Sequence, residues 1–147
     1  MHIAIGSDHG GFKLKQAIIA SLKKRKLSVK DFGSDSEESC DYPQYAYQVA
    51  KYVAAKSARR GILVCKSGIG TSIVANKVAG IRAALCHNIK TAKLSRQHND
   101  ANVLVLGSLF VDSAKAKKMI NEWLATKFEG GRHLRRVKQI ERIEHHV

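Results

Sequence analysis

The strongest constraint on the fold of this chain is an alternation of short apolar runs with longer amphipathic stretches. Five runs of strand-forming residues occur at positions 2–7, 27–32, 61–65, 81–86 and 103–106. The stretches between them repeat apolar residues every three or four positions, which is typical of helices with one buried face. Strands that alternate with helices through short turns form a parallel sheet covered on both faces. We therefore predict a three-layer, Rossmann-like α/β fold with a five-stranded parallel sheet.

Proline, glycine and capping residues mark the expected ends of the helices. A proline suits the first turn of a helix over 43–56, and Thr71 or Ser72 is placed to cap the helix after the third strand. Gly130 and Gly131 break the chain before a last, basic helix. We find no repeat and no linker long enough to divide domains.

The composition excludes several classes of protein. The 147 residues include 44% hydrophobic and 26% charged residues with a single proline, which excludes collagen-like and wholly disordered chains. No apolar stretch approaches the roughly 18 residues of a membrane span, and the first residues lack the pattern of a secretory signal. The three widely spaced cysteines suggest neither a disulfide framework nor a zinc ribbon. We expect a single domain over residues 1–147 in a reducing cytoplasm.

The chain is strongly basic, with 26 Lys and Arg against 12 Asp and Glu and a formal net charge of +14. This charge suits an anionic partner, either a nucleic acid or a phosphorylated metabolite. Much of it is consistent with a solvated surface, because Lys13, Lys15 and Lys23 lie on the apparently exposed faces of amphipathic stretches. A nucleic-acid-binding module is the less favoured interpretation, since aromatic residues make up 6% and form no stacking platform.

The residues that directly follow each strand are informative, because ligands of open parallel sheets bind beyond the carboxyl ends of the strands. Asp8 and His9 follow the first strand, and Cys65 ends the third strand before a glycine-rich turn. The start of a helix and the neighbouring Lys66 would both favour the thiolate form of Cys65. The other two cysteines are expected to be buried and inert.

The turn Ser67-Gly68-Ile69-Gly70 offers successive backbone N–H groups, which suit a phosphate or an oxyanion formed during a reaction. It is not a Walker A loop, because Gly-Lys-Ser/Thr is absent. It also fails the dinucleotide fingerprint, because Ile73 occupies the third glycine position. These differences argue against ATP and NAD, and no cofactor is expected.

Histidines and arginines supply further candidates. His9 and His98 are candidate acid or base groups, because an imidazole side chain ordinarily titrates near neutral pH, although a structural role would explain either of them. The other histidines, His133 among them, show no spacing of a closed metal site, so no metal is expected. Arg132 and Arg136 form a like-charged i,i+4 pair at the start of the last helix, where positive charge opposes the helix dipole. A phosphate would compensate them, while solvation or a disordered tail is the alternative.

Five segments of the chain resemble one known family. They are GSDHGG (6–11), DYPQYA (41–46), CKSGIGTSIVANKVAGIRAALC (65–86), SRQHNDANVLVLGS (95–108) and EGGRHLRRV (129–137). In this order and register they are similar to the type B ribose-5-phosphate isomerases, whose relatives isomerise galactose 6-phosphate and allose 6-phosphate. The resemblance extends over essentially the whole chain.

The resemblance implies cofactor-free interconversion of D-ribose 5-phosphate and D-ribulose 5-phosphate through an enediolate, in a homodimer whose subunits share active sites. It implies that Cys65 is the proton-abstracting base and that His98 opens the sugar ring. Ser67 and the loop amides would stabilise the enediolate charge. The implied substrate-binding residues are Asp8, His9, Tyr42, Lys66, Ser67, Gly68, Ile69, Gly70, Asn99, Arg132 and Arg136.

Two positions depart from the family pattern. Lys66 stands where glycine or another small residue is common, and Leu109 stands where many members have an arginine that contributes to phosphate binding. The second change is compatible with weaker phosphate affinity, with a different substrate length, or with compensation by Lys66 or another basic residue. The same chemistry on a six-carbon or four-carbon sugar phosphate therefore stays open.

The position of His98 predicts a shared site. His98 follows a short helix expected over 91–97 and precedes the fifth strand. In a βα repeat this places it at the edge of the sheet opposite Cys65, too far to share one substrate within a subunit. We expect His98 to serve the Cys65 of a partner chain, in a dimer or a dimer of dimers, so that a monomer is inactive.

Overall fold

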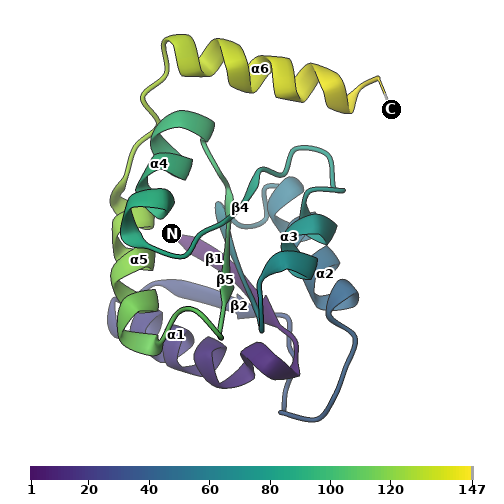
Figure 1. Ribbon diagram of the computed structural model, residues 1–147, viewed down its shortest axis with the longest axis vertical. Helices are drawn as coiled ribbons and strands as arrows, with labels where there is room; N and C mark the ends of the chain where they lie inside the picture. The colour runs from purple at the N-terminus through teal and green to yellow at the C-terminus, as the bar shows by residue number, and fades with distance from the viewer. Residues whose placement is uncertain (147) are drawn as a thin grey trace.

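The computed structural model describes residues 1–146 and contains one five-stranded, parallel sheet in the order β2-β1-β3-β5-β4 (Figure 1). The strands are β1 (His2–Ser7), β2 (Ser28–Asp31), β3 (Arg60–Cys65), β4 (Ala83–Leu85) and β5 (Val103–Gly107). The helices are the short 3-10 helix η1 (His9–Gly11), α1 (Phe12–Lys24), α2 (Tyr42–Ala54), α3 (Ile69–Ala75), α4 (Ile89–Asn99), α5 (Ser113–Ala125) and α6 (Arg132–Glu144). The predicted strand–helix alternation and parallel sheet are confirmed.

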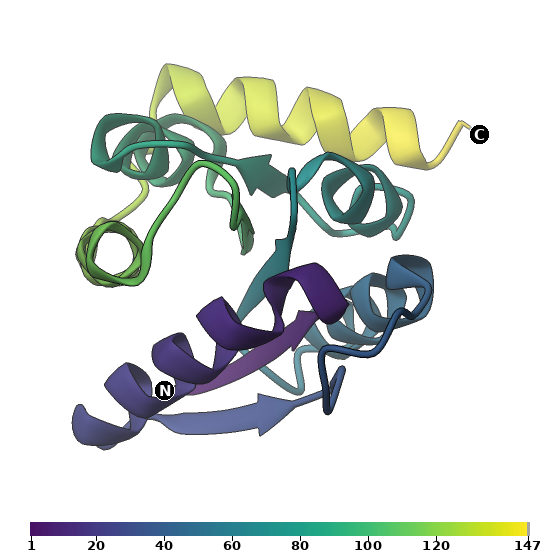
Figure 2. The same cartoon turned by 60° about the horizontal axis from the view of Figure 1, so that its bottom comes forward.

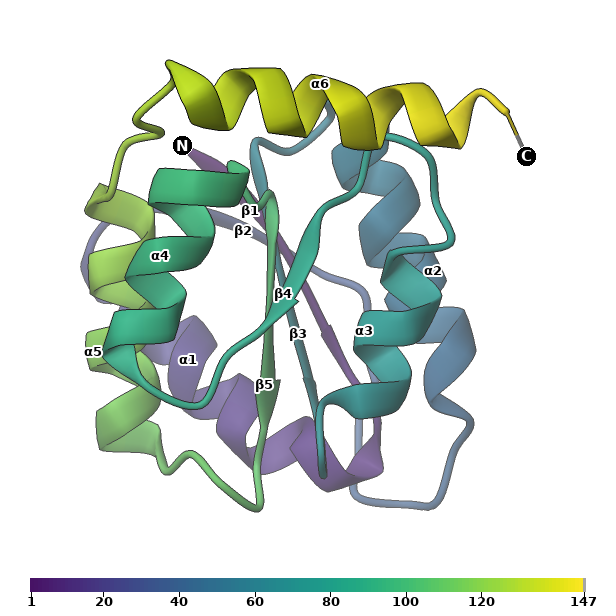
Figure 3. The ribbon, with the colours of Figure 1, turned by 45° about the horizontal axis from the view of Figure 1, so that its top comes forward.

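Helices cover both faces of the sheet, which confirms the three-layer arrangement. Helices α1, α4 and α5 lie on one face, and α2 and α3 lie on the other (Figure 3). The central strand β3 supplies Ile62 and Val64 to the first core and Leu63 to the second. A strand buried on both faces reads as a continuous apolar run, so this segment gave a strong signal in the sequence.

The strand order places a topological switch point at the carboxyl ends of β1 and β3. The chain moves from β1 outward to β2 and then returns to the other side of β1 to form β3. Helices leave the neighbouring strands in opposite directions at such a switch point, so the carboxyl ends are open to a ligand. The pairing of Ser7 with Val64 brings Asp8 and Cys65 next to each other.

Two helix boundaries differ from those predicted. Thr71 and Ser72 do not cap α3 but lie inside its first turn, and Gly68 is the residue that precedes the helix, with φ of +79°. Only glycine adopts this conformation without a steric penalty, so the backbone, and not a side-chain cap, sets the start of α3. Helix α4 is longer than the expected 91–97 and includes His98.

Lys15 corrects the expectation that it belongs to a solvated surface. Its side chain is fully buried, and its Nζ donates to both carboxylate oxygens of Asp31, at 2.7 and 2.9 Å, and to the Ser34 carbonyl at 2.7 Å. A buried charge is tolerated when it is paired and fully hydrogen-bonded. These bonds fasten the loop after β2, which leads to Cys40 and the candidate site.

Helix α6 crosses the amino-terminal ends of the strands. The arrowheads of β3 and β5 point away from it (Figure 3), and Figure 2 shows it passing α4 and α3, clear of α1. Val137 and His133 are buried on it, whereas Leu134, Ile140 and Ile143 are 42%, 41% and 64% exposed. No helix among residues 1–146 has the length and apolar character needed to cross a membrane.

Candidate active site

Cys65 lies at the carboxyl end of β3 with 4% of its surface exposed. Its Sγ accepts a hydrogen bond from the Gly68 N–H at 3.0 Å and lies 3.4 Å from the Thr71 hydroxyl oxygen. Both neighbours belong to the turn and the first residues of α3. Both groups can donate a hydrogen bond to the sulfur, which is the atom through which a cysteine acts as a base or a nucleophile.

Thr71 is a site residue that sequence analysis treated only as a helix cap. Its side chain is 1% exposed, and its hydroxyl donates to the Gly68 carbonyl at 3.2 Å. Because a hydroxyl rotates, the same proton can turn to Sγ of Cys65 when the sulfur is ionised. Cys65 and Thr71 are in contact because the chain folds back at the turn between them. The periodicity of the sequence does not predict such a contact.

Glycines bring the turn close to its surroundings. A Cβ added to Gly68 would lie 2.5 Å from Leu85 Cδ1 and 3.2 Å from the Leu106 carbonyl carbon. A Cβ added to Gly70 would lie 2.5 Å from Cζ of Tyr42, so the Tyr42 ring packs directly on the turn. The structure therefore places Tyr42 beside the loop, where a pocket wall was expected.

The amides of the turn are only partly free for a ligand. The Gly68 N–H donates to the sulfur, and the Ile69 N–H donates to Ser67 Oγ at 3.1 Å. Gly70 and Thr71 lie in the first turn of α3, where amides have no intrahelical partner. The amides of Gly70 and Thr71 are therefore better placed to bind an oxyanion than the amides of the loop as a whole.

Lys66 is held against the adjoining turn by its aliphatic chain. A Cβ added to Gly10 would lie 2.5 Å from Lys66 Cγ, so the lysine chain covers that glycine. The side chain is exposed. Its ammonium is therefore available at the same edge of the sheet as Cys65.

Asp8 and His9 follow β1 at the same edge. Asp8 is 6% exposed, and its Oδ1 accepts the Gly11 N–H at 3.0 Å, which caps η1. The Nδ1 of His9 accepts the Cys40 N–H at 3.2 Å, so the neutral ring carries its proton on Nε2. A cavity of about 510 Å³ opens beside these residues, and Tyr42 lines it too.

The two remaining cysteines differ from each other. Cys86 is 2% exposed, and burial raises the pKa of its thiol, as suits an inert core residue. Cys40 is half-buried, against the expectation of burial, and its Sγ lies 3.8 Å from Nδ1 of His9. The backbone amide of Cys40 orients His9. A backbone contact of this kind cannot be predicted from the type of residue.

A second group of candidate residues lies at the opposite, amino-terminal edge of the sheet. His98 and Asn99 form the last turn of α4, and Arg132 and Arg136 lie on α6, which packs on α4. The six residues of β3 separate this edge from Cys65 by about 17 Å. The structure thus divides the expected site residues into two groups that do not meet within one chain.

His98 stacks on His133, a contact that sequence analysis missed. The ring centroids are 4.2 Å apart and the planes are inclined by 8°. His133 is 7% exposed, and its Nε2 lies 3.4 Å from the Glu129 carboxylate. Burial lowers the pKa of His133, and the positive charges of its neighbours, His98 and Arg132 first, lower it further, while Glu129 acts in the opposite direction. His133 therefore favours its neutral form.

His98, Glu129 and His133 also bring three side chains with possible metal-ligand atoms together, which their spacing in the sequence did not indicate. Ligand atoms of His98, Glu129 and His133 all lie within 4.8 Å of one another. A metal ion accepts an imidazole lone pair in the plane of the ring, and two stacked, nearly parallel rings have no such point in common. In this geometry the group is a stacked pair with one carboxylate.

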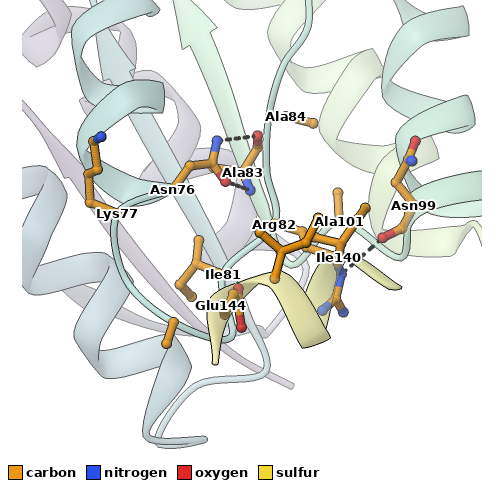
Figure 4. Close-up of a pocket in the computed structure, with 12 residues that line it drawn as sticks. Asn76, Lys77, Ile81, Arg82, Ala83, Ala84, Asn99, Ala101, Ile140 and Glu144 are labelled. Carbon is orange, nitrogen blue, oxygen red and sulfur yellow. Dashed lines mark hydrogen bonds between the residues drawn. The ribbon is translucent and has the colours of Figure 1, made fainter. Parts of the chain in front are cut away.

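Asn99 is fixed through its backbone beside a larger cavity. This cavity, of about 640 Å³, lies between α6 and the edge strand β4 (Figure 4). Arg82 Nε donates to the Asn99 carbonyl at 3.0 Å, and the Asn76 amide group exchanges two hydrogen bonds with the backbone of Ala83. Ile140 of α6 faces the same space (Figure 4).

The fold is thus a three-layer α/β sheet with a buried, hydrogen-bonded cysteine at one edge and two arginines, one helical turn apart, at the other. The model of the ribose/galactose isomerase family matches residues 3–140, and the chain belongs to that family. It is therefore a sugar-phosphate isomerase.

Individual relatives agree along the whole chain. Ribose-5-phosphate isomerase B of Escherichia coli (strain K12) is 51% identical over 142 residues, which are 97% of this chain and 95% of that protein. The structure of ribose-5-phosphate isomerase B from Clostridium thermocellum superposes with a TM-score of 0.98 at 49% identity and covers 99% of both chains. The Mycoplasma genitalium enzyme with bound ribulose-5-phosphate has a TM-score of 0.95 at 43% identity, covering 99% of this chain and 97% of that one.

Proposed function

We propose that this chain interconverts D-ribose 5-phosphate and D-ribulose 5-phosphate, with Cys65 as the base. The observation that carries the proposal is the contact of Sγ with the Gly68 N–H and the Thr71 hydroxyl, at 3.0 and 3.4 Å. Relatives that bear the name of this activity match almost the whole chain, and one of their structures contains ribulose-5-phosphate.

The chemistry at Cys65 is a proton transfer between two carbons. The thiolate takes the proton from C2 of the open-chain aldose, and the electron pair moves to form a C1–C2 double bond while the carbonyl oxygen gains charge. A proton also passes from the C2 hydroxyl to the C1 oxygen, so that return of the abstracted proton to C1 gives the ketose with its carbonyl at C2. The amides of Gly70 and Thr71, together with Ser67, would stabilise the enediolate oxygen. Asp8 and His9 would bind the sugar hydroxyls, and Tyr42 would form the wall of the pocket.

Ring opening and phosphate binding are assigned to the opposite edge. His98 would exchange a proton with the ring oxygen, and Asn99 would bind the sugar beside it. Arg132 and Arg136, one helical turn apart on α6, would hold the phosphate in bidentate hydrogen bonds. Since this edge lies about 17 Å from Cys65, a partner chain must supply these groups.

A symmetric homodimer satisfies this requirement. A two-fold axis that brings the amino edge of the first subunit to the carboxyl edge of the second also brings the amino edge of the second to the carboxyl edge of the first. Two complete sites result. Exposed apolar side chains at both edges support such an interface. They are Ile69, Ile73, Leu109 and Phe110 near Cys65, and Leu134, Ile140 and Ile143 on α6.

Leu109 bears on the choice of substrate. It is 69% exposed and places an apolar side chain at the carboxyl edge. Lys66 is the exposed cation of the Cys65 turn and would take over part of the phosphate contact. A panel of four-, five- and six-carbon sugar phosphates, compared by kcat/KM, tests the substrate: ribose 5-phosphate should be converted best. Preference for a hexose phosphate would overturn the assignment.

The shared site is tested by mixing two inactive variants. Cys65→Ala and His98→Ala chains should each be inactive as homodimers. After subunit exchange, half of the dimers are mixed, and each has one site with both residues intact, so about a quarter of the wild-type activity should return. Mixed dimers that form without regaining activity would contradict the exchange of residues between subunits.

A further inference from the structure

A separate cationic cavity lies at the amino-terminal edge of the sheet, between the end of α2 and the turns that precede β4 and β5. Its volume is about 360 Å³. Lys56, Arg59, Arg60 and Arg82 line it, with Asp100 as the acidic member. None of these residues is assigned to bind substrate in the isomerase site proposed above, although Arg82 also donates to the Asn99 carbonyl.

The positive charges of this cavity exceed the negative ones. Asp100 is already shared, because its carboxylate lies 2.7 Å from the buried Arg96 and 3.4 Å from Arg82. Arg82 is also paired with Glu141 at 3.4 Å. Within residues 1–146, no carboxylate lies within 4.0 Å of Lys56, Arg59 or Arg60. Three cations therefore line one cavity without a counterion from the chain.

Arg60 is the most constrained of the three cations. Its guanidinium lies over the Trp123 ring, with Cζ 5.8 Å from the centroid, and its Nη1 donates to the Arg59 carbonyl at 2.9 Å. Burial and the nearby charge of Arg96 lower the pKa of Arg60 to about 10. An arginine held among like charges raises the free energy of the empty cavity, and an anion would relieve that cost.

Lys56 is the second cation of the cavity. It lies two residues beyond the end of α2, in the left-handed region, with φ of +59°. Glycine is the usual residue at such a helix end, because a side chain there carries a steric cost. The exposed side chain of Lys56 lines the cavity.

We propose that this cavity binds a small, multiply charged phosphate compound such as a diphosphate. Guanidinium groups bind phosphate oxygens in bidentate pairs, and the compact charge of a diphosphate matches three neighbouring cations. Val53 and Ala58, 5% and 3% exposed, close the inner side of the cavity. The cavity is small, at about 360 Å³, and its Arg60 is half-buried, which favours a small ligand over the continuous backbone of a nucleic acid.

The test uses inorganic pyrophosphate and a protein that lacks the proposed substrate clamp. Calorimetric titration of the Arg132→Gln/Arg136→Gln variant at physiological salt should show one pyrophosphate bound per chain. Adding Lys56→Gln and Arg59→Gln should weaken binding by about tenfold or more. Both added positions are exposed, and a thermal melt checks that the variant folds.

The matched control removes two exposed lysines from α1. Lys23→Gln/Lys24→Gln in the same background changes the net charge equally and should leave the affinity unaltered. Equal weakening in the control, or no pyrophosphate binding in the clamp-deficient protein, would overturn the proposal. A short RNA that binds this cavity more tightly than pyrophosphate would also overturn it, in favour of a nucleic-acid site. Because the clamp is absent throughout, failure here leaves the proposed isomerase site untouched.

Discussion

At the carboxyl edge of the sheet, the side chains proposed for chemistry are held by the backbone, whereas at the amino edge they stand on the ends of helices. The sulfur of Cys65 is fixed by an amide and a buried hydroxyl in a turn that glycine makes possible. Arg132 and Arg136 are exposed and reach outward from α6. Proton transfer from carbon demands a precisely placed base, while a phosphate can be held by long side chains that adjust to it.

The largest expected effect breaks the chemistry at the carboxyl edge. Cys65→Ser keeps the volume and the hydrogen bonds of the site, but a hydroxyl is a much weaker acid than a thiol and stays protonated. We expect kcat to fall by about a thousandfold with little change in KM. Steady-state kinetics with ribose 5-phosphate measures both constants. Cys86→Ser, at a buried position away from the turn, is the control and should retain near wild-type activity.

Turnover that survived in Cys65→Ser would show that another group abstracts the proton. The contacts around the sulfur would then serve only to pack the end of β3. The carboxyl edge would no longer differ from the amino edge by holding a precisely placed base.

A second prediction separates two effects of substituting a glycine: the cost of a positive φ and the cost of steric contact with neighbouring atoms. Gly68 and Gly80 have nearly the same φ, +79° and +82°, but Gly68 is surrounded by Leu85 and the backbone of β5 while nothing lies within 4 Å of the Gly80 position. Gly80→Ala should lower the free energy of unfolding by about 1 kcal/mol. Gly68→Ala should lower it by about 3 kcal/mol and reduce kcat by about a hundredfold.

Chemical denaturation and activity assays on the two variants check this difference. Equal losses of stability would mean that the surroundings of Gly68 relax without cost. A stable Gly68→Ala variant with full activity would show that the position of the Gly68 amide does not matter to the sulfur.

The framework of the fold could be predicted because its signals are local. The run 61–65 is apolar at successive positions, which only a strand covered on both faces requires, and the rule for parallel sheets then placed Asp8 and Cys65 at one edge. The start of α3 was predicted wrongly, because Thr71 and Ser72 suit a cap as residue types while the positive φ of Gly68 decides the boundary.

Contacts between distant side chains could not be predicted in the same way. His98 and His133 belong to different helices, and their stacking depends on how α6 packs on α4. Lys15 was assigned to the surface because lysine is usually exposed, but Asp31 and the Ser34 carbonyl lie where its ammonium can reach them. A sequence pattern predicts which face of a helix is buried. It does not predict which side chains of other elements that face contacts.

The smallest expected effect concerns the charge balance at the amino edge. The pKa of His133 is lowered in the folded chain by burial and by the positive charges around it, with Glu129 in opposition. In the unfolded chain it returns to the ordinary histidine value of about 6.5, so below that value the unfolded state binds more protons. This contribution to stability is complete above about pH 6.5 and is lost as the pH falls toward the lowered value.

His133→Phe keeps an aromatic ring against His98 but cannot take up a proton. Between about pH 7.5 and 5.5, the wild type should therefore lose more free energy of unfolding than this variant. Denaturant titrations at the two pH values measure the difference, and His145→Phe, at an exposed position near the end of α6, is the control. Identical pH dependence in wild type and His133→Phe would mean that His133 accepts a proton in the folded chain as easily as in the unfolded one. In that case the attraction of Glu129 would balance burial and the positive charges around His133.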